Sequence, residues 1–433
     1  MRLRPRRSRS QVELAGTFAA LRVRNYRLYF AGQAVSLAGT WMQSVALSWL
    51  VFELTHSGTA IGLVLAAEFL PVLILGAYGG LIADRLPKRP LLMGTQTALA
   101  SLATILGLLV ITHVVALWMV FVLAALLGIV LAVDNPARQT FVMEMVGPGR
   151  IQNAVSLNSV LTNASRAVGP AIAGALIAFV GVGICFLANA LSFVAVLVAL
   201  AMMRPTELRP SEPAGHEPGQ LRAGLHYVRT TRGLLVPLLM MALIGTLAYE
   251  FPVLLPLLAH QSFHGGAETF GFFTSTMGAG AVAGGLLVAT LEFTGLEPLT
   301  FAAAGFGLAI LVATAAPTLA SELVALVLVG GASTVFMATG NSTLQLTSDP
   351  SFRGRVMALW SVTFSGSTPI GGPIVGAVCE FASPRAGLAL GAGACLLAAA
   401  LGAAAVTRTP PGERRHPHPV QMDWAAYQQA QGA

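Results

Sequence analysis

The chain has 433 residues, of which 55% are hydrophobic and only 10% are charged, and its mean hydropathy is +0.74. A soluble domain carries about a quarter charged residues, and several apolar runs here approach the ~20 residues that span a bilayer as a helix. The composition excludes a soluble protein and indicates an all-α integral membrane protein.

Apolar runs bounded by charges, Pro/Gly clusters or polar turns predict twelve membrane-spanning helices. They lie near residues 28–52, 59–83, 91–112, 115–134, 153–179, 182–203, 234–260, 268–291, 298–316, 320–341, 354–380 and 385–406. The longest polar interruption is a linker, 204–233, which separates two six-helix halves, 28–203 and 234–406. A basic arm, 1–27, precedes the first half, and a polar tail, 407–433, follows the second.

The basic residues support this topology. With twelve spans, 23 of the 25 basic residues fall on one side, while Arg385 lies on the other side and Arg166 lies within a span. The positive-inside rule then places both termini in the cytoplasm. Such a girdle suits the anionic headgroups of a lipid bilayer, so the net charge of +7 does not indicate a nucleic-acid partner.

The first span carries a polar stripe. Gln33, Ser36, Thr40 and Gln43 are spaced i, i+3, i+7 and i+10, which puts them on one helical face. Together with aromatic contact from residues such as Tyr249, this face is a candidate lining for a substrate cavity. The alternative is that the stripe makes hydrogen bonds to neighbouring helices.

The hairpin between the second and third spans holds the densest internal charge cluster, in the sequence "GGLIADRLPKRPLL". Asp84 closes the second span, and Arg85, Lys88 and Arg89 follow within five residues. Lys88 is the only lysine of the chain.

Three ionisable residues lie well within spans: Glu68, Arg166 and Glu250. Each costs on the order of 3 kcal/mol at a helix centre, so such residues usually have a partner or a function. At 1.5 Å per residue, all three lie roughly 24 Å from the basic side and so could meet. A proline follows each acid within three residues and is expected to bend the helix beside it.

Two interpretations of these charges stand side by side. In the first, Glu68 or Glu250 exchanges a proton, with Arg166 as the counter-charge that couples proton binding to conformation. In the second, the charges form a static ion pair, or an acid simply faces water in the cavity.

The fifth and eleventh spans match at an offset of 203 residues. Arg150, Asn158, Thr162 and Ser165 align with Arg353, Ser361, Ser365 and Thr368, and Gly169-Pro170 aligns with Gly372-Pro373. Two parallel halves of common design around a central site are a secondary-transporter architecture.

These residues resemble the major facilitator superfamily. The hairpin is similar to its signature Gly-x-x-x-Asp-Arg-x-Gly-Arg-Arg, and reads Gly80, Asp84 and Arg85, then Pro87 in place of Gly, then Lys88 and Arg89. That proline, the arm from Leu21 onward, the "NPARQTFVMEMV" loop and "SRAVGPAIAGAL" resemble the subgroup of enterobactin and macrolide exporters.

The resemblance carries two implications for gating and coupling. Gly169, Pro170 and Gly174 look like the superfamily's antiporter motif Gly-Pro-x-x-Gly-Gly, with Ala173 at one glycine. The superfamily also packs the second span against the eleventh, so Asp84 would face the positive helix end near Arg353 and latch the halves in the outward-facing state. The alternative is a topological anchor with no role in gating.

The sequence indicates no enzyme and no cofactor. There is no Gly-x-x-x-x-Gly-Lys-Ser/Thr, so no P-loop binds ATP. Three scattered cysteines have no metal-ligand spacing, and no metal site is expected.

The expected function is export of a small, amphipathic, drug-like or siderophore-like molecule from a bacterial cytoplasm, in exchange for protons and by alternating access. The partners would be that substrate, protons and the lipid bilayer of the inner membrane, and the protein would act as a monomer. Proton-coupled uptake by symport is the first alternative. A non-transporting sensor or assembly partner and a lipid transporter are the others.

Overall fold

The computed structural model describes residues 18–209, 220–290 and 294–408, and these are almost wholly helical. Residues 1–17 of the expected arm, 210–219 of the linker and 409–433 of the tail lie outside the described residues. Helices are the expected outcome, since a backbone without water must satisfy its own hydrogen bonds.

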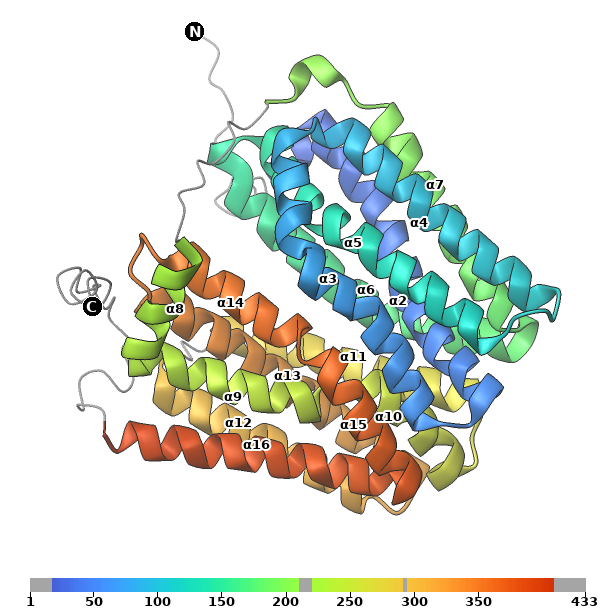
Figure 1. Ribbon diagram of the computed structural model, residues 1–433, viewed down its shortest axis with the longest axis vertical. Coiled ribbons are helices and arrows are strands. Elements are labelled where there is room, and N and C mark those ends of the chain that lie inside the picture. Colours follow the sequence, from blue (N-terminus) through green and yellow to red (C-terminus); the bar gives the residue numbers. More distant parts are fainter. Residues whose placement is uncertain (1–17, 210–219, 291–293, 409–433) are drawn as a thin grey trace, which may run out of the picture.

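The first half of the chain forms one six-helix bundle (Figure 1). After a short turn, η1 (Ala20–Arg22), come α2 (Arg24–Thr55), α3 (Gly58–Arg85), α4 (Lys88–Ile111), α5 (Leu117–Val146), α6 (Ile151–Val180) and α7 (Val182–Ala201). The linker that follows contains a surface helix, α8 (Gln220–Thr230), which packs beside α9 and α14.

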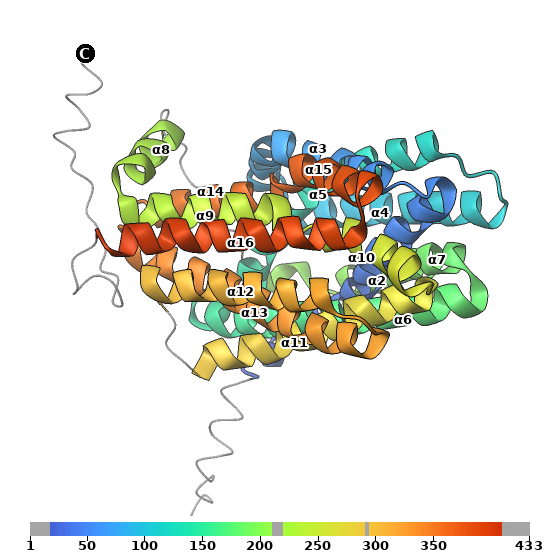
Figure 2. The ribbon, with the colours of Figure 1, turned by 90° about the horizontal axis from the view of Figure 1, so that it is seen from below.

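The second half forms a matching bundle, seen from another side in Figure 2. Its helices are α9 (Arg232–Ala248), α10 (Phe251–Leu257) with the π-helical turn η4 (Leu258–Ser262), α11 (Ala267–Thr290), α12 (Leu296–Ala315), α13 (Leu319–Thr347), α14 (Arg353–Ser365), α15 (Thr368–Phe381) and α16 (Pro384–Val406). Helix breaks divide two expected spans, 234–260 and 354–380.

Within the described residues, eleven helical segments are long and apolar enough to cross a membrane. The remaining expected span, 354–380, is divided at Gly366 and Ser367 into α14 and α15, each too short alone. The all-helical membrane fold is therefore confirmed, and the number twelve stays a prediction.

The predicted end of the fourth span was wrong, and the error concerns a charged residue. The expected span 115–134 left Arg138 in a loop, but α5 continues to Val146 with Pro136 inside it. The carbonyl of Ala132, which Pro136 deprives of its helical donor, lies against the backbone of α3, where Gly79 has no side chain to interfere. Close packing on α3 thus accommodates the proline that the sequence suggested as a helix end.

The helix ends fall into two groups, which we call the basic end and the opposite end. The basic end contains the α3–α4 hairpin, the start of α2, the end of α7 and the start of α14. The opposite end contains the α2–α3 loop and the α15–α16 loop. Among the described residues, Arg385 is the one arginine at the opposite end and Arg166 the one midway, as the charge count predicted.

The two halves are in contact through glycines near the opposite end, along what we call the seam. A Cβ placed on Gly174 of α6 would lie 2.9 Å from the Cα of Gly271 on α11, and one on Gly58 of α3 would lie 2.7 Å from the carbonyl of Gly376 on α15. Gly62 approaches Gly372 more closely still. Glycines allow helix backbones to approach this closely in a membrane, so van der Waals contact can hold the helices together without polar side chains.

One carboxylate also joins the halves at this end. Glu380 of α15 accepts hydrogen bonds from the Ser57 hydroxyl (2.5 Å) and the Thr59 N–H (3.1 Å), at the first turn of α3. An acid at a helix N-terminus is favoured by the helix dipole and by its free N–H groups.

Towards the basic end, the halves part. The contact between α3 and the eleventh span reaches Leu73, which lies against Gly366. Beyond it, Gly76 and Gly80 of α3 and Gly354 of α14 are open, because a Cβ on any of them would meet no atom within 4 Å. Glycine backbones of the two halves are therefore in contact near the opposite end, and these three glycines near the basic end face open space.

Replacing Gly62 by leucine should separate the halves at the opposite end, because its Cβ would collide with the Gly372 backbone, which cannot move aside alone. The measurement is the distance between spin labels at His113 and Leu319, which lie at that end in different halves. The matched control is Gly76→Leu on the same helix, where a side chain finds open space. An unchanged distance in Gly62→Leu, or an equal change in Gly76→Leu, would contradict the seam.

Candidate functional site

The seventh span breaks beside its acid. α9 ends at Ala248 and α10 begins at Phe251, so Tyr249 and Glu250 lie between the two helices. Pro252 lies in the first turn of α10, where its missing N–H is harmless and its fixed φ suits a helix start. The prolines predicted a bend beside each acid; at Glu250 the helix is broken, whereas α3 is continuous through Pro71.

Glu250 is 3% exposed and lies at the start of α15, the point where the eleventh span is also broken. The Thr368 side chain hydrogen-bonds its carboxylate, while Oε1 has no hydrogen-bond partner. A Cβ on Gly371 would lie 3.0 Å from that oxygen, so the glycine leaves room for it. Two broken helices thus meet at one buried acid, as in the binding sites of many transporters.

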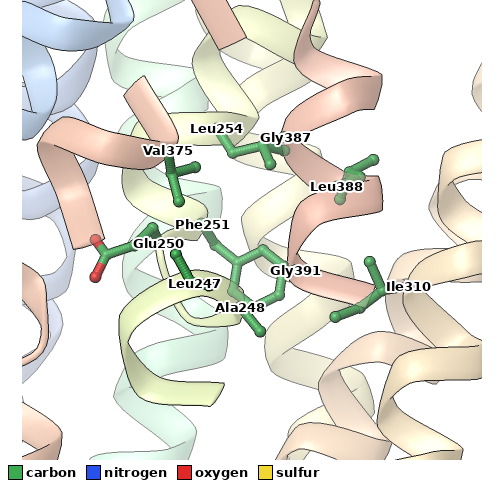
Figure 3. A pocket seen from close by; sticks show the side chains of 10 residues that line it. All are labelled: Leu247, Ala248, Glu250, Phe251, Leu254, Ile310, Val375, Gly387, Leu388 and Gly391. Atoms are coloured by element: carbon green, nitrogen blue, oxygen red, sulfur yellow. The ribbon is translucent and has the colours of Figure 1, made fainter. Parts of the chain in front are cut away.

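The small cavity nearest to Glu250 is not a substrate site. It encloses about 10 Å³, space for a single water at most. Apolar groups such as Leu254, Ile310 and Leu388 line it, and the Glu250 carboxylate points away from it towards the end of a neighbouring helix (Figure 3).

Glu68 lies on the continuous helix α3 and is half-buried. Pro71 lies inside that helix without breaking it, and both Pro71 and the Glu68 carbonyl lie close to Gly128 of α5. No hydrogen bond or ion pair of the Glu68 carboxylate is found among the described residues. Glu68 and Glu250 therefore sit on different halves and in different surroundings.

Arg166 lies on α6 and is half-buried, with its guanidinium carbon 4.8 Å from the centre of the Trp41 ring of α2. It also interacts electrostatically with Tyr249, which belongs to the other half. The Tyr249 hydroxyl donates a 2.7 Å hydrogen bond to the Ser333 carbonyl, so its oxygen lone pairs remain available. The Arg166 Nε has no hydrogen-bond partner.

The structure does not bring the three intramembrane charges into contact. Among the described residues, Arg166 forms no ion pair within 4 Å with Glu68 or Glu250; the ion pairs found are elsewhere. The expectation that Arg166 directly neutralises one of these acids is therefore wrong for this conformation. Similar depth along three helices does not fix the direction in which their side chains point.

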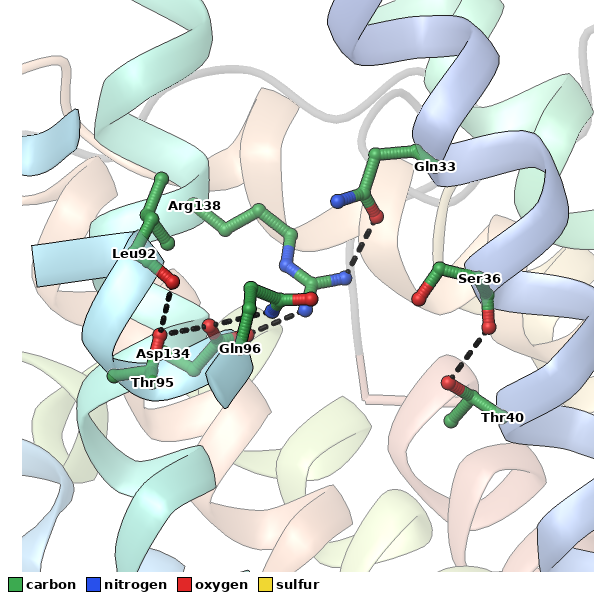
Figure 4. A network of polar contacts seen from close by, with 8 residues as sticks. All are labelled: Gln33, Ser36, Thr40, Leu92, Thr95, Gln96, Asp134 and Arg138. Carbon is green, nitrogen blue, oxygen red and sulfur yellow. Dashed lines mark hydrogen bonds and ion pairs between the residues drawn. The ribbon is translucent and has the colours of Figure 1, made fainter. Parts of the chain in front are cut away.

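Two of the four residues in the polar stripe of the first span make hydrogen bonds to neighbouring helices. Gln33 accepts a 2.9 Å hydrogen bond from Arg138 of α5, and Gln43 accepts one of 2.6 Å from Asn189 of α7. Ser36 is buried, and Thr40 is exposed but donates to the Ser36 carbonyl (Figure 4). The helix-to-helix alternative thus holds for Gln33 and Gln43.

A buried polar network in the first half was missed by the sequence reasoning (Figure 4). Asp134 of α5 is fully buried, forms an ion pair with Arg138, and accepts hydrogen bonds from Thr95 (2.6 Å) and Gln96 (2.9 Å) of α4. Through Gln33 the network reaches α2, so it joins three helices. The signal was the i, i+4 spacing of Asp134 and Arg138, which pairs charges on a helix.

The charged hairpin has two kinds of residue. Lys88 pairs with the buried Glu144 of α5 at 3.8 Å, and Arg89 donates to two carbonyls at the end of α7, at 2.8 and 3.2 Å. These cations fasten the hairpin to its own half. Asp84 and Arg85 have no side-chain partner among the described residues, and Gly80 beside them faces open space.

The antiporter-like motif lies along the packed faces of α6. Gly169 lies against Trp41 and Ala38 of α2, and Gly174 lies in the seam. Pro170 deprives the Arg166 carbonyl of its helical donor. That carbonyl lies against α11, 3.0 Å from where a Cβ of Gly278 would be, so it contacts the other half.

Curated relatives of this chain are transporters. The chain is 27% identical over 289 residues to the staphyloferrin A transporter of Staphylococcus aureus, covering 66% of this chain and 72% of the relative. It is 26% identical over 378 residues to the enterobactin exporter EntS of Shigella boydii, covering 83% and 86%. It is 23% identical over 270 residues to macrolide efflux protein A of Streptococcus pyogenes, covering 61% and 67%.

A solved structure shares the fold at low identity. A peptide transporter of the POT family superposes with a TM-score of 0.71 at 12% identity, covering 89% of this chain and 96% of that one. The family model described as transmembrane secretion effector matches residues 15–429, nearly the whole chain. The chain belongs to this transmembrane secretion effector family, and is a multi-pass membrane transporter of the major facilitator type, not an enzyme.

Proposed function

We propose that this protein exports a small, amphipathic organic molecule in exchange for protons, by alternating access. The observation that carries the proposal is the pair of broken helices that meet at Glu250 beside the seam between the halves. The exporter relatives support the direction. The charge distribution supports an orientation with the basic end, and so both termini, at the cytoplasmic face of a bacterial inner membrane.

The arrangement of contacts supports alternating access. Bare glycine backbones and Glu380 hold the opposite end closed, while the basic end is open. In the proposed orientation this is the inward-facing state, ready to take substrate from the cytoplasm. Neither half needs to unfold for the reverse state, because hydrogen bonds join the helices within each half.

Glu250 is the acid best suited to carry the proton. It is buried, one of its oxygens lacks a partner, and it contacts α15 through Thr368. The N-terminus of α15 would stabilise the ionised Glu250 carboxylate. When the helices move and this contact is lost, the protonated carboxyl group would be favoured. Glu68 is the second candidate, because no other charge neutralises it.

Asp84 is proposed as the latch of the outward-facing state. Its side chain has no hydrogen-bond or ion-pair partner among the described residues, whereas its neighbours Lys88 and Arg89 bond to groups of their own half. Closure of the basic end would bring Asp84 to the start of α14, where a carboxylate is favoured by the helix dipole. At that terminus Asp349 already accepts hydrogen bonds from Ser351, which lower the pKa of Asp349.

The proposed function predicts protonophore-sensitive efflux. Accumulation of a panel of fluorescent drugs, dyes and siderophores would be measured in an efflux-deficient bacterium that expresses this chain, with and without a protonophore. We expect lower accumulation of at least one compound, restored by the protonophore, and at least tenfold slower efflux in Glu250→Gln. Proton-driven efflux that survives Glu250→Gln and Glu68→Gln together would eliminate these acids as carriers, and raised accumulation would reverse the direction.

The latch predicts a defect in Asp84→Asn. The variant should reach the membrane in normal amount, because the Asp84 side chain makes no hydrogen bond or ion pair among the described residues, yet its transport rate should fall severalfold. The control is Glu207→Gln, which removes an acid that pairs only with exposed Arg204 at the same end. Full activity in Asp84→Asn would leave Asp84 as a topological anchor.

A further inference from the structure

Arg166 is a cation in the middle of the bundle without an anion to neutralise it. No carboxylate lies within 4 Å of it among the described residues, and its Nε lacks any hydrogen-bond partner. Arg138, a half-buried arginine of the same half, is by contrast paired with Asp134 and bonded to Gln33. An unpaired charge inside a membrane is costly, so an anion would stabilise Arg166, and none of the described residues supplies one within 4 Å.

One aromatic side chain covers the Arg166 guanidinium, and a second interacts with it electrostatically. Trp41 of the first half lies over it at 4.8 Å from the ring centre, and Tyr249 of the second half is the electrostatic partner. Tyr249 is held by its bond to Ser333 and by ring packing against Phe306 and Phe364. An arginine that lies over an aromatic ring suits a planar organic anion, since the ring offers apolar surface and the guanidinium a pair of donors.

A polar face leads from the basic end to Arg166. Ser159 and Thr162 precede it on α6 at spacings of seven and four residues, so all three share one side of the helix. Ser159 is exposed and Thr162 half-buried. The Thr162 hydroxyl donates a 2.9 Å hydrogen bond to a carbonyl of its own helix. It therefore does not need a hydrogen bond from a ligand.

We infer that Arg166 binds the negatively charged group of the substrate, a carboxylate or an ionised phenol, with the adjoining aromatic or apolar part against Trp41 and Tyr249. The inference rests on the proposed function and narrows it to organic anions. The acids reinforce the selectivity: Glu68 and Glu250 do not neutralise Arg166, so the substrate's charge is the one that completes the site. Binding then joins the two halves, since Trp41 and Arg166 belong to one and Tyr249 to the other.

The test compares two probes that differ only in charge. Purified full-length protein in nanodiscs is titrated with 2-naphthoate and with the neutral 2-naphthamide, and binding is read from naphthalene fluorescence against empty nanodiscs. We expect the naphthoate to bind more tightly than the amide by about 10- to 100-fold, the range for a hydrogen-bonded charged group. Arg166→Gln should abolish this preference while leaving amide binding within about twofold.

Two further variants keep the result interpretable. Arg166→Lys retains the charge without the planar fork and should keep part of the preference. Arg229→Gln removes an exposed arginine from α8 and should change nothing. A naphthoate preference that persists in Arg166→Gln, or no preference in the wild type, overturns the inference.

Efflux measurements separate this inference from the proposed function. Charge-selective binding that depends on Arg166, in a protein that moves no compound, would overturn export and leave the anion site standing. Proton-driven efflux of neutral or cationic dyes, with no dependence of naphthoate binding on Arg166, would overturn the anion site and leave export standing.

Discussion

An ionised side chain inside a bilayer is tolerated only where another group neutralises or solvates it, and this constraint sorts the buried charges of the protein into two classes. Asp134 with Arg138, and Lys88 with Glu144, are paired within the first half. They fasten helices together and need nothing from outside. Glu68, Arg166 and Glu250 are unpaired, and two of them lie beside the seam between the halves. These unpaired side chains are therefore the ones for which a ligand, a proton or a second conformation would supply the missing partner.

The contacts between the halves differ in kind from those within them. Within the first half, hydrogen bonds and ion pairs fix α2, α4 and α5 together. Between the halves, glycine backbones touch, rings such as Trp49 and Phe270 stack, and the Glu380 carboxylate accepts hydrogen bonds at a helix start. Van der Waals attraction is lost once two surfaces separate by an ångström or two. Breaking such a contact leaves no polar group buried without a hydrogen-bond partner. Such a seam can open at little cost, which suits halves that move as rigid bodies.

Much of the fold could be read from the sequence, because apolar length and the one-sided placement of arginine are strong signals. The central linker and the break beside Glu250 followed from polarity and proline. Failures came where tertiary contacts decide. Pro136 looked like a helix end, but the freed carbonyl of Ala132 packs against Gly79 and the helix runs on. Gln33 looked like a cavity residue because its partner, Arg138, had been assigned to a loop.

The direction of side chains was the other limit, and it changes the chemistry assigned to Arg166. Helix spacing gives depth, so Glu68, Arg166 and Glu250 were expected to meet; rotation about each helix axis keeps them apart. An arginine paired with an acid would have a structural role and would not need a ligand to neutralise it. Arg166 instead lies over the Trp41 ring, interacts electrostatically with Tyr249, and has its carbonyl against Gly278 of the other half. In the proposed mechanism, the substrate's charge and the movement of the halves would act on these same groups. Under the proposed function, coupling would require no long pathway, because a substrate anion at Arg166 and a proton at Glu250 would both act on the helix break that contains Tyr249.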